Sequence, residues 1–370
     1  MKRIKVPPRE NWQKRLEVAG FTFHSIEGIY WNEGVGYEFT SDEIDRIESA
    51  TAELQKISLE AVQYVMDKDL FDKLSIKGRA KEMVLDSWAR EDKSVYGRFD
   101  LCYDNDVPRL LEYNADTPTS LVESSIAQWV WLEDMFPQHD QFNSIHEKLM
   151  DAFREVSGIV GDGIMHFTCV QDSEEDLMTT EYMRDMAVQC GIETKHIFIE
   201  DIGFAEKEGC FADLDNNVIS FLFKLYPWEW LMNDDFGRHV TKDNAVFFEP
   251  AWKMVLSNKG ILPVLWEMYP GHPNLLPCYF DPSGMRTCHV KKPLLSREGA
   301  NVELVGRYGS REATGGAYGA EGYVYQEEKR LPSFDGNYAV VGSWVINGLP
   351  AGIGIREDNS PITQNTSRFV

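Results

Sequence analysis

The feature that most constrains the fold is a pair of short stretches that have the pattern of the two arms of a β-hairpin. One contains Arg98-Phe99-Asp100 and the other Glu112-Tyr113-Asn114, and both have apolar neighbours. The segment 104–108 between them reads Asp-Asn-Asp-Val-Pro, a cluster of residues that favour turns. Because residues at i and i+2 of a strand lie on the same face of a sheet, each arm presents two polar side chains together.

The position of the turn predicts which side chains meet. With the turn centred on Asp106, Arg98 faces Asn114 and Asp100 faces Glu112 in an antiparallel pair. One guanidinium, two carboxylates and one amide then share a patch, and such oxygens beside an arginine suit Mg²⁺ and a polyphosphate. The same pattern also fits an exposed hairpin with a cross-strand ion pair, which is common and weak. The pattern alone leaves both interpretations open.

Composition and charge exclude several classes of partner. The chain has a formal net charge of −23, whereas nucleic acids and anionic membranes attract an excess of Lys and Arg. The basic N-terminus is not followed by the apolar stretch of a secretory signal, and no run of about 18 apolar residues could span a membrane. The six cysteines form no Cys-x-x-Cys, which is typical of a reduced protein. We expect a cytoplasmic protein that binds neither nucleic acid nor membrane, and whose charge favours a cationic small molecule.

The order of periodic segments predicts a mixed α+β / α/β fold of about two or three lobes. A capping box at Thr40–Glu43 opens a long helix whose apolar positions recur at helical spacing. The region 143–224 alternates helices with strands and has the pattern of a β-α-β unit. From Val246 onward Gly, Lys and Pro become frequent, with strands expected at 302–305, 322–326, 338–345 and 352–356.

A polar loop follows the second arm of the hairpin. It runs from Asn114 to Ser120 and precedes a helix predicted over 121–136. Free N–H groups at the start of that helix, behind Thr119 and Ser120, would suit a substrate carboxylate. Thr119 and Ser120 could equally serve only as helix caps.

Two basic positions later in the chain suit phosphate groups, although no GxxxxGK[ST] or GxGxxG loop is present. Lys259 precedes an apolar helical run. Lys292 ends a predicted strand before the loop 296–299, whose N–H groups could form an anion nest. Each lysine alone is more often a solvated surface charge. Arg356 ends a strand with alternating glycines, which indicates a close backbone approach and a directed charge.

Several motifs in a fixed order resemble one known family. They read YGRFDLCYD, LLEYNADTPTS, NKGILPVLWEMYP, VKKPLLSREGAN and PAGIGIRED. Together they resemble the synthetase portion of glutathionylspermidine synthases, and more closely the shorter acid–amine ligases related to them. The resemblance runs from about Pro8 to the last residue.

This resemblance implies an ATP-grasp fold with a mobile glycine-rich lid. Residues 1–370 would form one synthetase module, in which roughly 8–245 make a pre-ATP-grasp-like substrate and metal region. Roughly 246–370 would make the ATP-binding lobe and lid, with the hairpin 97–114 completing the site. Glycines concentrated in 290–320 mark the expected lid.

The resemblance also implies roles for individual residues. Those expected to contact ATP are Arg98, Asp100, Lys259, Lys292, Gly299 and, on the adenine side, Gln326. Those expected to hold Mg²⁺, as two ions, are Asp100, Glu112 and Asn114. Arg98 and Arg356 would be catalytic by stabilising the transferred phosphoryl group, and we further expect Thr117 and Ser120 to contact the substrate.

The implied activity is that of an ATP- and Mg²⁺-dependent carboxylate–amine ligase. It would join a peptide-like acid to an amine through an acyl phosphate and release ADP and phosphate, and the acidic charge favours a polyamine-like amine. The chain has no room for the separate amidase domain of bifunctional members, and the loop Thr117-Pro118-Thr119-Ser120 differs from that of true glutathionylspermidine synthases, so glutathione itself is not implied. The alternative is an ATP-binding regulatory protein with only residual ATPase activity.

Overall fold

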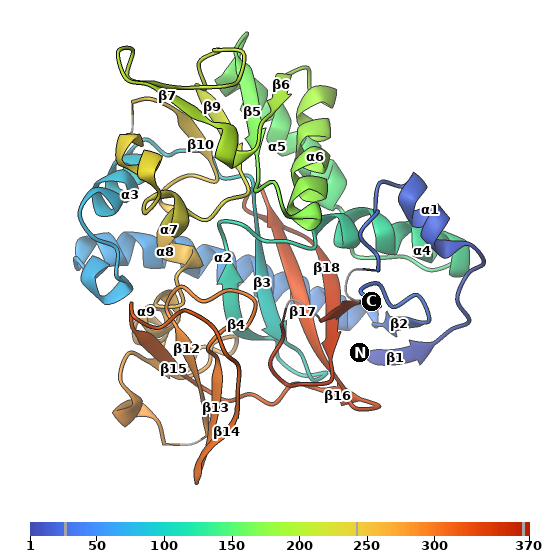
Figure 1. Cartoon of the computed structure of the whole chain (residues 1–370). Helices are drawn as coiled ribbons and strands as arrows, with labels where there is room; N and C mark the ends of the chain where they lie inside the picture. The colour runs from blue at the N-terminus through green and yellow to red at the C-terminus, as the bar shows by residue number, and fades with distance from the viewer. Residues whose placement is uncertain (26–27, 242, 287, 365–366) are drawn as a thin grey trace.

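The computed structural model describes residues 1–25, 28–241, 243–286, 288–364 and 367–370. Its framework is a central antiparallel sheet, flanked on one side by a parallel sheet and on the other by a second antiparallel sheet (Figure 1). Helices pack against these sheets. The mixed α/β fold expected from the sequence is therefore confirmed.

The central sheet contains the predicted hairpin. Its order is β19-β18-β17-β3-β4, with β16 paired to β17. Because β17 pairs with β3, strands from the end of the chain lie directly beside the hairpin. The strands are β3 (Tyr96–Cys102), β4 (Arg109–Asn114), β16 (Ser333–Phe334), β17 (Asn337–Ile346), β18 (Leu349–Asp358) and β19 (Arg368–Phe369).

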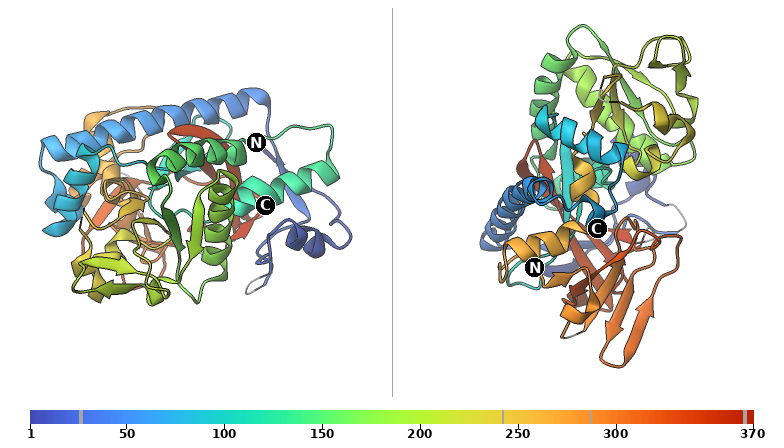
Figure 2. Two further views of the ribbon diagram at one scale, coloured as in Figure 1. Left: turned by 90° about the horizontal axis from the view of Figure 1, so that it is seen from above. Right: turned by 90° about the vertical axis from the view of Figure 1, so that its left-hand side faces the viewer.

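The long helix α2 (Ser41–Asp67) covers one face of this sheet (Figure 2). The predicted capping box is present, since Glu43 N donates to Thr40 Oγ1 at 3.3 Å and Thr40 N donates to Glu43 Oε2 at 2.8 Å. On the covered face, Gln55 of α2 accepts a hydrogen bond from Tyr113 at 2.8 Å, and Phe99 stacks on Tyr113. Strand side chains alternate between faces, so the polar residues flanking Phe99 and Tyr113 point to the opposite face.

The parallel sheet forms a separate lobe and confirms the predicted β-α-β unit. Its order is β10-β9-β5-β6, with all neighbours parallel. The elements are α5 (Ile145–Val160), β5 (Ile164–Thr168), α6 (Glu174–Gln189), β6 (Glu193–His196), β9 (Phe221–Lys224) and β10 (Val246–Phe248), with a small hairpin of β7 (Gly203–Ala205) and β8 (Cys210–Ala212) and the short helix α7 (Trp228–Leu231).

The second antiparallel sheet forms the lobe at the other end of the central sheet. Its order is β11-β15-β12-β13-β14. The elements are α8 (Lys253–Ser257), α9 (Ile261–Met268), β11 (Cys278–Tyr279), β12 (His289–Pro293), β13 (Glu303–Gly306), β14 (Gly309–Ala313) and β15 (Tyr323–Glu327). Strand β14 was not expected, because its residues are mostly exposed and show no apolar alternation.

The N-terminal segment packs beside the C-terminal strand, where Phe369 N donates to Tyr30 O at 2.8 Å. The remaining elements are β1 (Lys2–Lys5), α1 (Trp12–Val18), β2 (Val35–Glu38), α3 (Arg79–Ala89), a π-helical turn (Glu123–Ala127) that continues into α4 (Gln128–Met135), and 3₁₀ turns at Phe71–Leu74, Ile199–Asp201, Asp235–His239 and Pro282–Gly284. None of the helices in the described part of the chain is long and apolar enough to cross a lipid bilayer.

Candidate functional site

The register predicted for the hairpin is confirmed at the site. Arg98 pairs with Asn114 and Asp100 pairs with Glu112. Beyond these pairs β4 contains a bulge at Leu111, after which Leu101 pairs with Leu110. The prediction of one continuous register is therefore wrong toward the turn, because the extra residue shifts the pairing by one.

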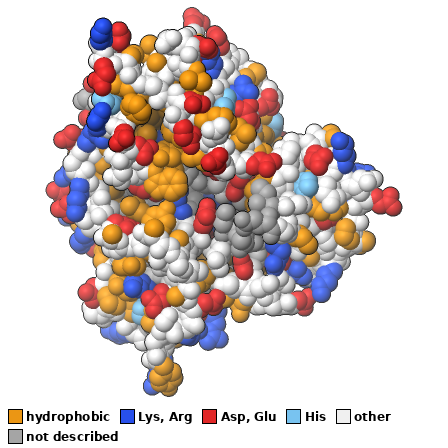
Figure 3. Space-filling model, viewed as in Figure 1, with side chains coloured by type: hydrophobic (Ala, Val, Ile, Leu, Met, Phe, Trp, Pro, Cys, Tyr) orange, Lys and Arg blue, Asp and Glu red, His pale blue; other side chains and the backbone are white. Residues whose placement is uncertain are grey.

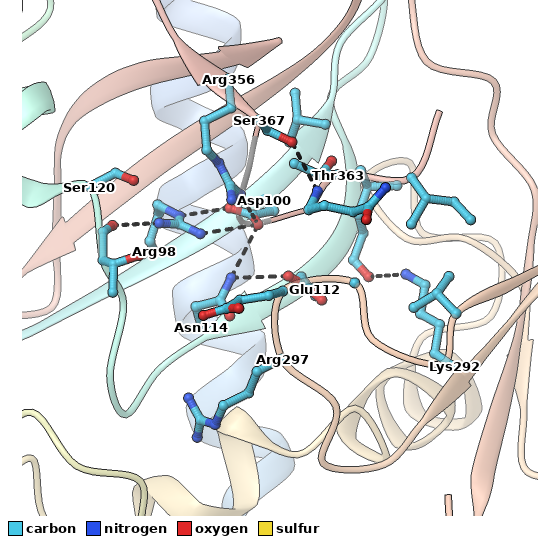
Figure 4. Close-up of a pocket in the computed structure, with 18 of the residues that line it drawn as sticks. Arg98, Asp100, Glu112, Asn114, Ser120, Lys292, Arg297, Arg356, Thr363 and Ser367 are labelled. Atoms are coloured by element: carbon cyan, nitrogen blue, oxygen red, sulfur yellow. Dashed lines mark hydrogen bonds and ion pairs between the residues drawn. The ribbon is translucent and has the colours of Figure 1, made fainter. Parts of the chain in front are cut away.

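Three donor side chains meet at Asp100 on the uncovered face of the sheet (Figure 4). Arg98 donates from Nε to Oδ1 at 2.8 Å, Arg356 donates from Nη2 to Oδ2 at 2.5 Å, and Asn114 donates from Nδ2 to Oδ2 at 3.1 Å. Gly342 belongs to β17, which lies between β3 and β18, and a Cβ there would come within 2.9 Å of Arg98 Cδ. The absence of a side chain at this position leaves room for the guanidinium.

The alternating glycines before Arg356 do permit the close approach that was expected. A Cβ on Gly354 would lie 2.4 Å from Ser124 Oγ and 2.5 Å from Phe369 Cζ. The π-helical turn containing Ser124 thus packs directly on β18. Arg356 lies one step further along the same face, and its charge points at Asp100.

Two lysines place positive charge beside Glu112. Lys259 Nζ lies 3.1 Å from Glu112 Oε2 and also donates to Ser296 O at 2.5 Å. Burial alone would raise the pKa of Glu112, but the charges of Lys259 and Lys292 hold it below its ordinary value. Glu112 is therefore an anion held between cations.

Lys292 is positioned by the bulge in β4. Its Nζ donates to the carbonyl of Leu111 at 2.8 Å and to Gln326 Oε1 at 2.7 Å. Burial lowers the pKa of Lys292 to about 8, although the charge of Glu112 opposes this change. Gln326 also donates to Leu110 O at 2.9 Å, so it lies buried beneath Lys292 instead of lining the cavity. Its expected contact with adenine stays a prediction.

The loop after β12 requires glycine at the expected position. Gly299 has a φ of 68°, and a Cβ there would lie 2.3 Å from Thr363 O. In the same loop, Arg297 donates to Thr117 Oγ1 at 2.6 Å and to Glu229 Oε1 at 2.7 Å. The loop is thereby tied across the cavity to two other segments.

The polar loop after Asn114 also reaches the cavity, which residues 117–120 line. Ser120 has a φ of 65°, and its hydroxyl lies 3.2 Å from that of Tyr30. The φ of Ser120 places it in the left-handed region. The interpretation of Thr119 and Ser120 as helix caps stays open.

These groups surround a cavity of about 680 Å³. Its wall on the side of the parallel sheet includes Tyr226, Trp230, Glu175 and Asp176. Burial raises the pKa of Glu175, with Glu298 adding to the effect, and burial together with Glu175 raises the pKa of Asp176 to about 7. On the surface around the cavity, hydrophobic side chains gather near α7, while acidic side chains are spread over the whole face (Figure 3).

The oxygens of the hairpin fit a hard cation. No cluster of three or more His, Cys, Asp and Glu side chains suited to a metal occurs among the described residues. The carboxylates of Asp100 and Glu112, however, both accept from Asn114 Nδ2, at 3.1 and 3.2 Å. A rotation of the Asn114 amide would turn its oxygen toward the same point. This set could hold Mg²⁺ if water and phosphate oxygens completed the coordination.

The structure brings together nearly every residue expected at the site. Arg98, Asp100, Glu112, Asn114, Thr117, Ser120, Lys259, Lys292, Gly299 and Arg356 all line the cavity. The sequence analysis missed Arg297, Glu229, Glu175, Asp176 and Tyr30. Glu175 and Asp176 lie in the first turn of α6, where acidic residues occur routinely, so the sequence gives no separate signal for them.

Comparisons with known proteins identify the family of the chain. The family model described as "Glutathionylspermidine synthase preATP-grasp" matches residues 3–370. A protein of Haemophilus influenzae, named provisionally as an acid–amine ligase, is 41% identical and covers 100% of this chain and 98% of its own length. A trypanothione synthetase of Crithidia fasciculata is 29% identical over 76% of this chain, and the bifunctional glutathionylspermidine synthetase/amidase of Escherichia coli is 25% identical over 90%.

Those last two relatives are longer. The chain spans 48% of the trypanothione synthetase and 58% of the bifunctional enzyme. Among solved structures, a glutathione synthetase-like effector of Globodera pallida in its apo form shares the fold, with a TM-score of 0.58 over 99% of this chain and 98% of its own. Its sequence identity is 9%, so this similarity concerns the fold alone.

The titration of Lys292 yields a testable prediction. Below a pH of about 8 its amine is charged and attracts phosphate, and as the pH rises through that value the attraction is lost. The dissociation constant for inorganic triphosphate, measured by calorimetry between about pH 6.5 and 9.5, should therefore rise above about pH 8. In Glu112→Gln the rise should begin at lower pH, because the charge of Glu112 raises the pKa of Lys292.

The matched control is Glu303→Gln, which removes a carboxylate 3.7 Å from the neighbouring Lys291. Its pH profile should match the wild type. An unchanged profile in Glu112→Gln would contradict the coupling between Glu112 and Lys292.

Proposed function

Because the chain belongs to the glutathionylspermidine synthase family of ATP-dependent ligases, we propose that it joins a carboxylate to an amine through an acyl phosphate, with an ATP-grasp fold and Mg²⁺. A carboxylate oxygen of the acid attacks the γ-phosphorus of ATP, and ADP leaves. The amine nitrogen then attacks the acyl carbon, the C–O bond to phosphate breaks, and the amine releases a proton. The products are an amide, ADP and phosphate.

The observation that carries this proposal is the mixture of charges on one face of the hairpin. Asp100 and Glu112 lie among four cations, Arg98, Arg356, Lys259 and Lys292, around one cavity. Phosphoryl transfer requires positioning and charge neutralisation more than covalent help from the protein. A purely structural ion-pair cluster would not require a cavity of this size beside it.

The protein groups then have distinct roles. Lys259, Lys292 and the N–H groups of the loop at Gly299 bind the phosphates. Arg98 and Arg356 stabilise the charge of the transferred phosphoryl group and of the later oxyanion. Asp100, Glu112 and Asn114 would hold Mg²⁺, which neutralises phosphate charge when it is bound. Arg356 needs a guanidinium, because its forked donors can engage Asp100 and an oxyanion together.

The walls of the cavity indicate the class of amine. Glu175, Asp176 and Glu298 line one part of it, and the pKa values of Glu175 and Asp176 are raised. Burial is the main cause of both shifts, with the neighbouring carboxylates adding to it, and a bound cation would offset both effects. This supports a polyamine-like amine next to a peptide-like acid held near Thr117 and Ser120.

The alternative function is an ATP-binding regulatory protein with residual ATPase activity. Against it stands the presence of the charged groups that the ligase reaction requires, in contact with one another. Release of ADP that depends on both an acid and an amine supports the ligase. Binding of Mg-ATP with no stimulation by any acid–amine pair supports the regulator.

The fate of oxygen atoms tests the acyl phosphate. Glutathione with spermidine is tried first, followed by a panel of peptides and polyamines, with ¹⁸O in the reacting carboxylate. One labelled oxygen should appear in the released phosphate, because that oxygen bridges carbon and phosphorus in the intermediate. Mass spectrometry of the phosphate and chromatography of the nucleotide provide the readout. Formation of AMP, or unlabelled phosphate from an active pair, would rule the mechanism out.

The metal assignment is tested with Asp100→Asn. This change should lower kcat by about 100-fold or more, the scale known for loss of a key electrostatic group. It should also raise the Mg²⁺ concentration that gives half-maximal ADP release. The matched control is Asp104→Asn, on the turn of the same hairpin, where the carboxylate pairs with Lys329 at 2.6 Å. Wild-type Mg²⁺ dependence in folded Asp100→Asn would contradict the assignment.

We expect the segment 290–320 to act as a lid over bound ATP. It contains most of β12 and all of β13 and β14, and its loop at Gly299 lines the cavity. Tyr308, at the tip of the β13–β14 hairpin, is 96% exposed, so trypsin should cut beside it at Arg307 and Arg311 when the hairpin opens. Mg-ATP should slow this cleavage, whereas AMP, which lacks the β- and γ-phosphates, should not. Equal cleavage with and without Mg-ATP would indicate a rigid surface hairpin.

A further inference from the structure

A fully buried ion pair lies behind the cavity wall. Lys224, the last residue of β9, places its Nζ 2.7 Å from Oδ1 of Asp116, and both side chains have no exposed surface. Asp116 lies two residues after Asn114 at the end of the hairpin. Neither residue lines the cavity, so neither can touch a substrate in this arrangement.

The pair fixes two separate segments to each other. Asp116 Oδ2 accepts from the backbone N–H of Trp228 at 2.9 Å, and Lys224 Nζ donates to Tyr226 O at 3.0 Å. The ammonium also lies 4.6 Å from the centre of the Trp228 ring. Trp228 is itself held, because its Nε1 donates to Glu249 O at 3.0 Å. The pair thus joins the chain at Asp116 to residues 226–228.

These two segments each carry part of the cavity wall. Residues 117–120 follow Asp116 directly, and Tyr226, Pro227 and Trp230 follow Lys224. Arg297 bridges the two segments, because it donates to Thr117 Oγ1 at 2.6 Å and to Glu229 Oε1 at 2.7 Å. A small displacement of either segment would break one of these two bonds.

Stability alone does not account for such a pair. The desolvation of two charges offsets most of their attraction, and apolar side chains of similar volume often stabilise a core at least as well. What a buried, hydrogen-bonded ion pair does provide is a fixed geometry for the groups that it joins. Here those groups are the backbones of two cavity walls.

We propose that Lys224 and Asp116 are positioning residues that hold these two walls at a fixed separation and thereby determine which acid and amine the cavity accepts. The inference rests on the proposed ligase function for the identity of the substrates. Lys259 and Lys292, which bind the phosphates in that function, have their own supports in Ser296, Leu111 and Gln326.

The test uses the full-length protein with two variants. Lys224→Met removes one charge, and Asp116→Asn/Lys224→Met removes both, so that no buried carboxylate is left without a partner. The control is Lys195→Met, in β6 of the same parallel sheet. It removes ion pairs with Asp213 at 2.9 Å and Asp215 at 2.7 Å. Circular dichroism and the melting temperature identify variants that fold.

The first readout is hydrogen–deuterium exchange, which needs no substrate. In the folded double variant, amides in 115–120 and 225–231 should exchange about tenfold faster, while those of β3 should not change. The control should leave both segments as in the wild type. Wild-type exchange in both segments of the folded double variant would overturn the proposal.

The second readout separates positioning from general damage. With an acid–amine pair that the wild type joins, KM for the acid or the amine should rise about tenfold, on the scale of a displacement below 1 Å, while KM for ATP changes less than about twofold. A rise in KM for ATP equal to that for the acid or the amine would also overturn the proposal. If the wild type joins no acid to any amine, the proposed function fails, but the exchange measurement still decides whether the pair holds the walls.

Discussion

The pairing of β3 with β4 on one side and β17 on the other is the constraint on which the site depends. It places Asp100 beside Glu112 and beside Gly342 in one sheet. Because side chains alternate, Phe99 and Tyr113 pack toward α2 while their neighbours reach the cavity. A slip of one residue would bury the charged groups under α2 and expose the aromatic ones. The buried contact with α2 therefore protects the register that the chemistry requires.

Much of this arrangement could be predicted from the sequence, since it follows from local rules. The turn residues near Asp106 and the alternation of the two arms predict the pairs at the site, and the capping box predicts the start of α2. The bulge at Leu111 could not be predicted, because it depends on Lys292 and Gln326 from a distant segment. Strand β14 lacks apolar alternation, and its pairing with β13 is what makes it a strand.

The groups that the sequence analysis missed share one physical property: their roles depend on partners far away in the chain. Arg297 is one charged residue in a polar loop until Thr117 and Glu229 are placed beside it. Lys224 ends an apolar strand and gives no sign of its partner, Asp116, 108 positions earlier. Buried charges of this kind are uncommon and require partners, but a single sequence does not identify which residues those partners are.

Because of the bulge at Leu111, the number of residues in the hairpin determines whether Lys292 has a backbone acceptor. An extra residue in β4 turns one carbonyl out of the regular ladder, and that carbonyl accepts from Lys292. A chain lacking residue 111 could close the same turn with regular pairing, yet it would offer the lysine one acceptor fewer. Insertions and deletions should therefore be tolerated in the exposed turn at 104–106, whereas a deletion at Leu111 should be selected against. In relatives of this chain, the spacing between the two arms carries information as specific as the residues within them.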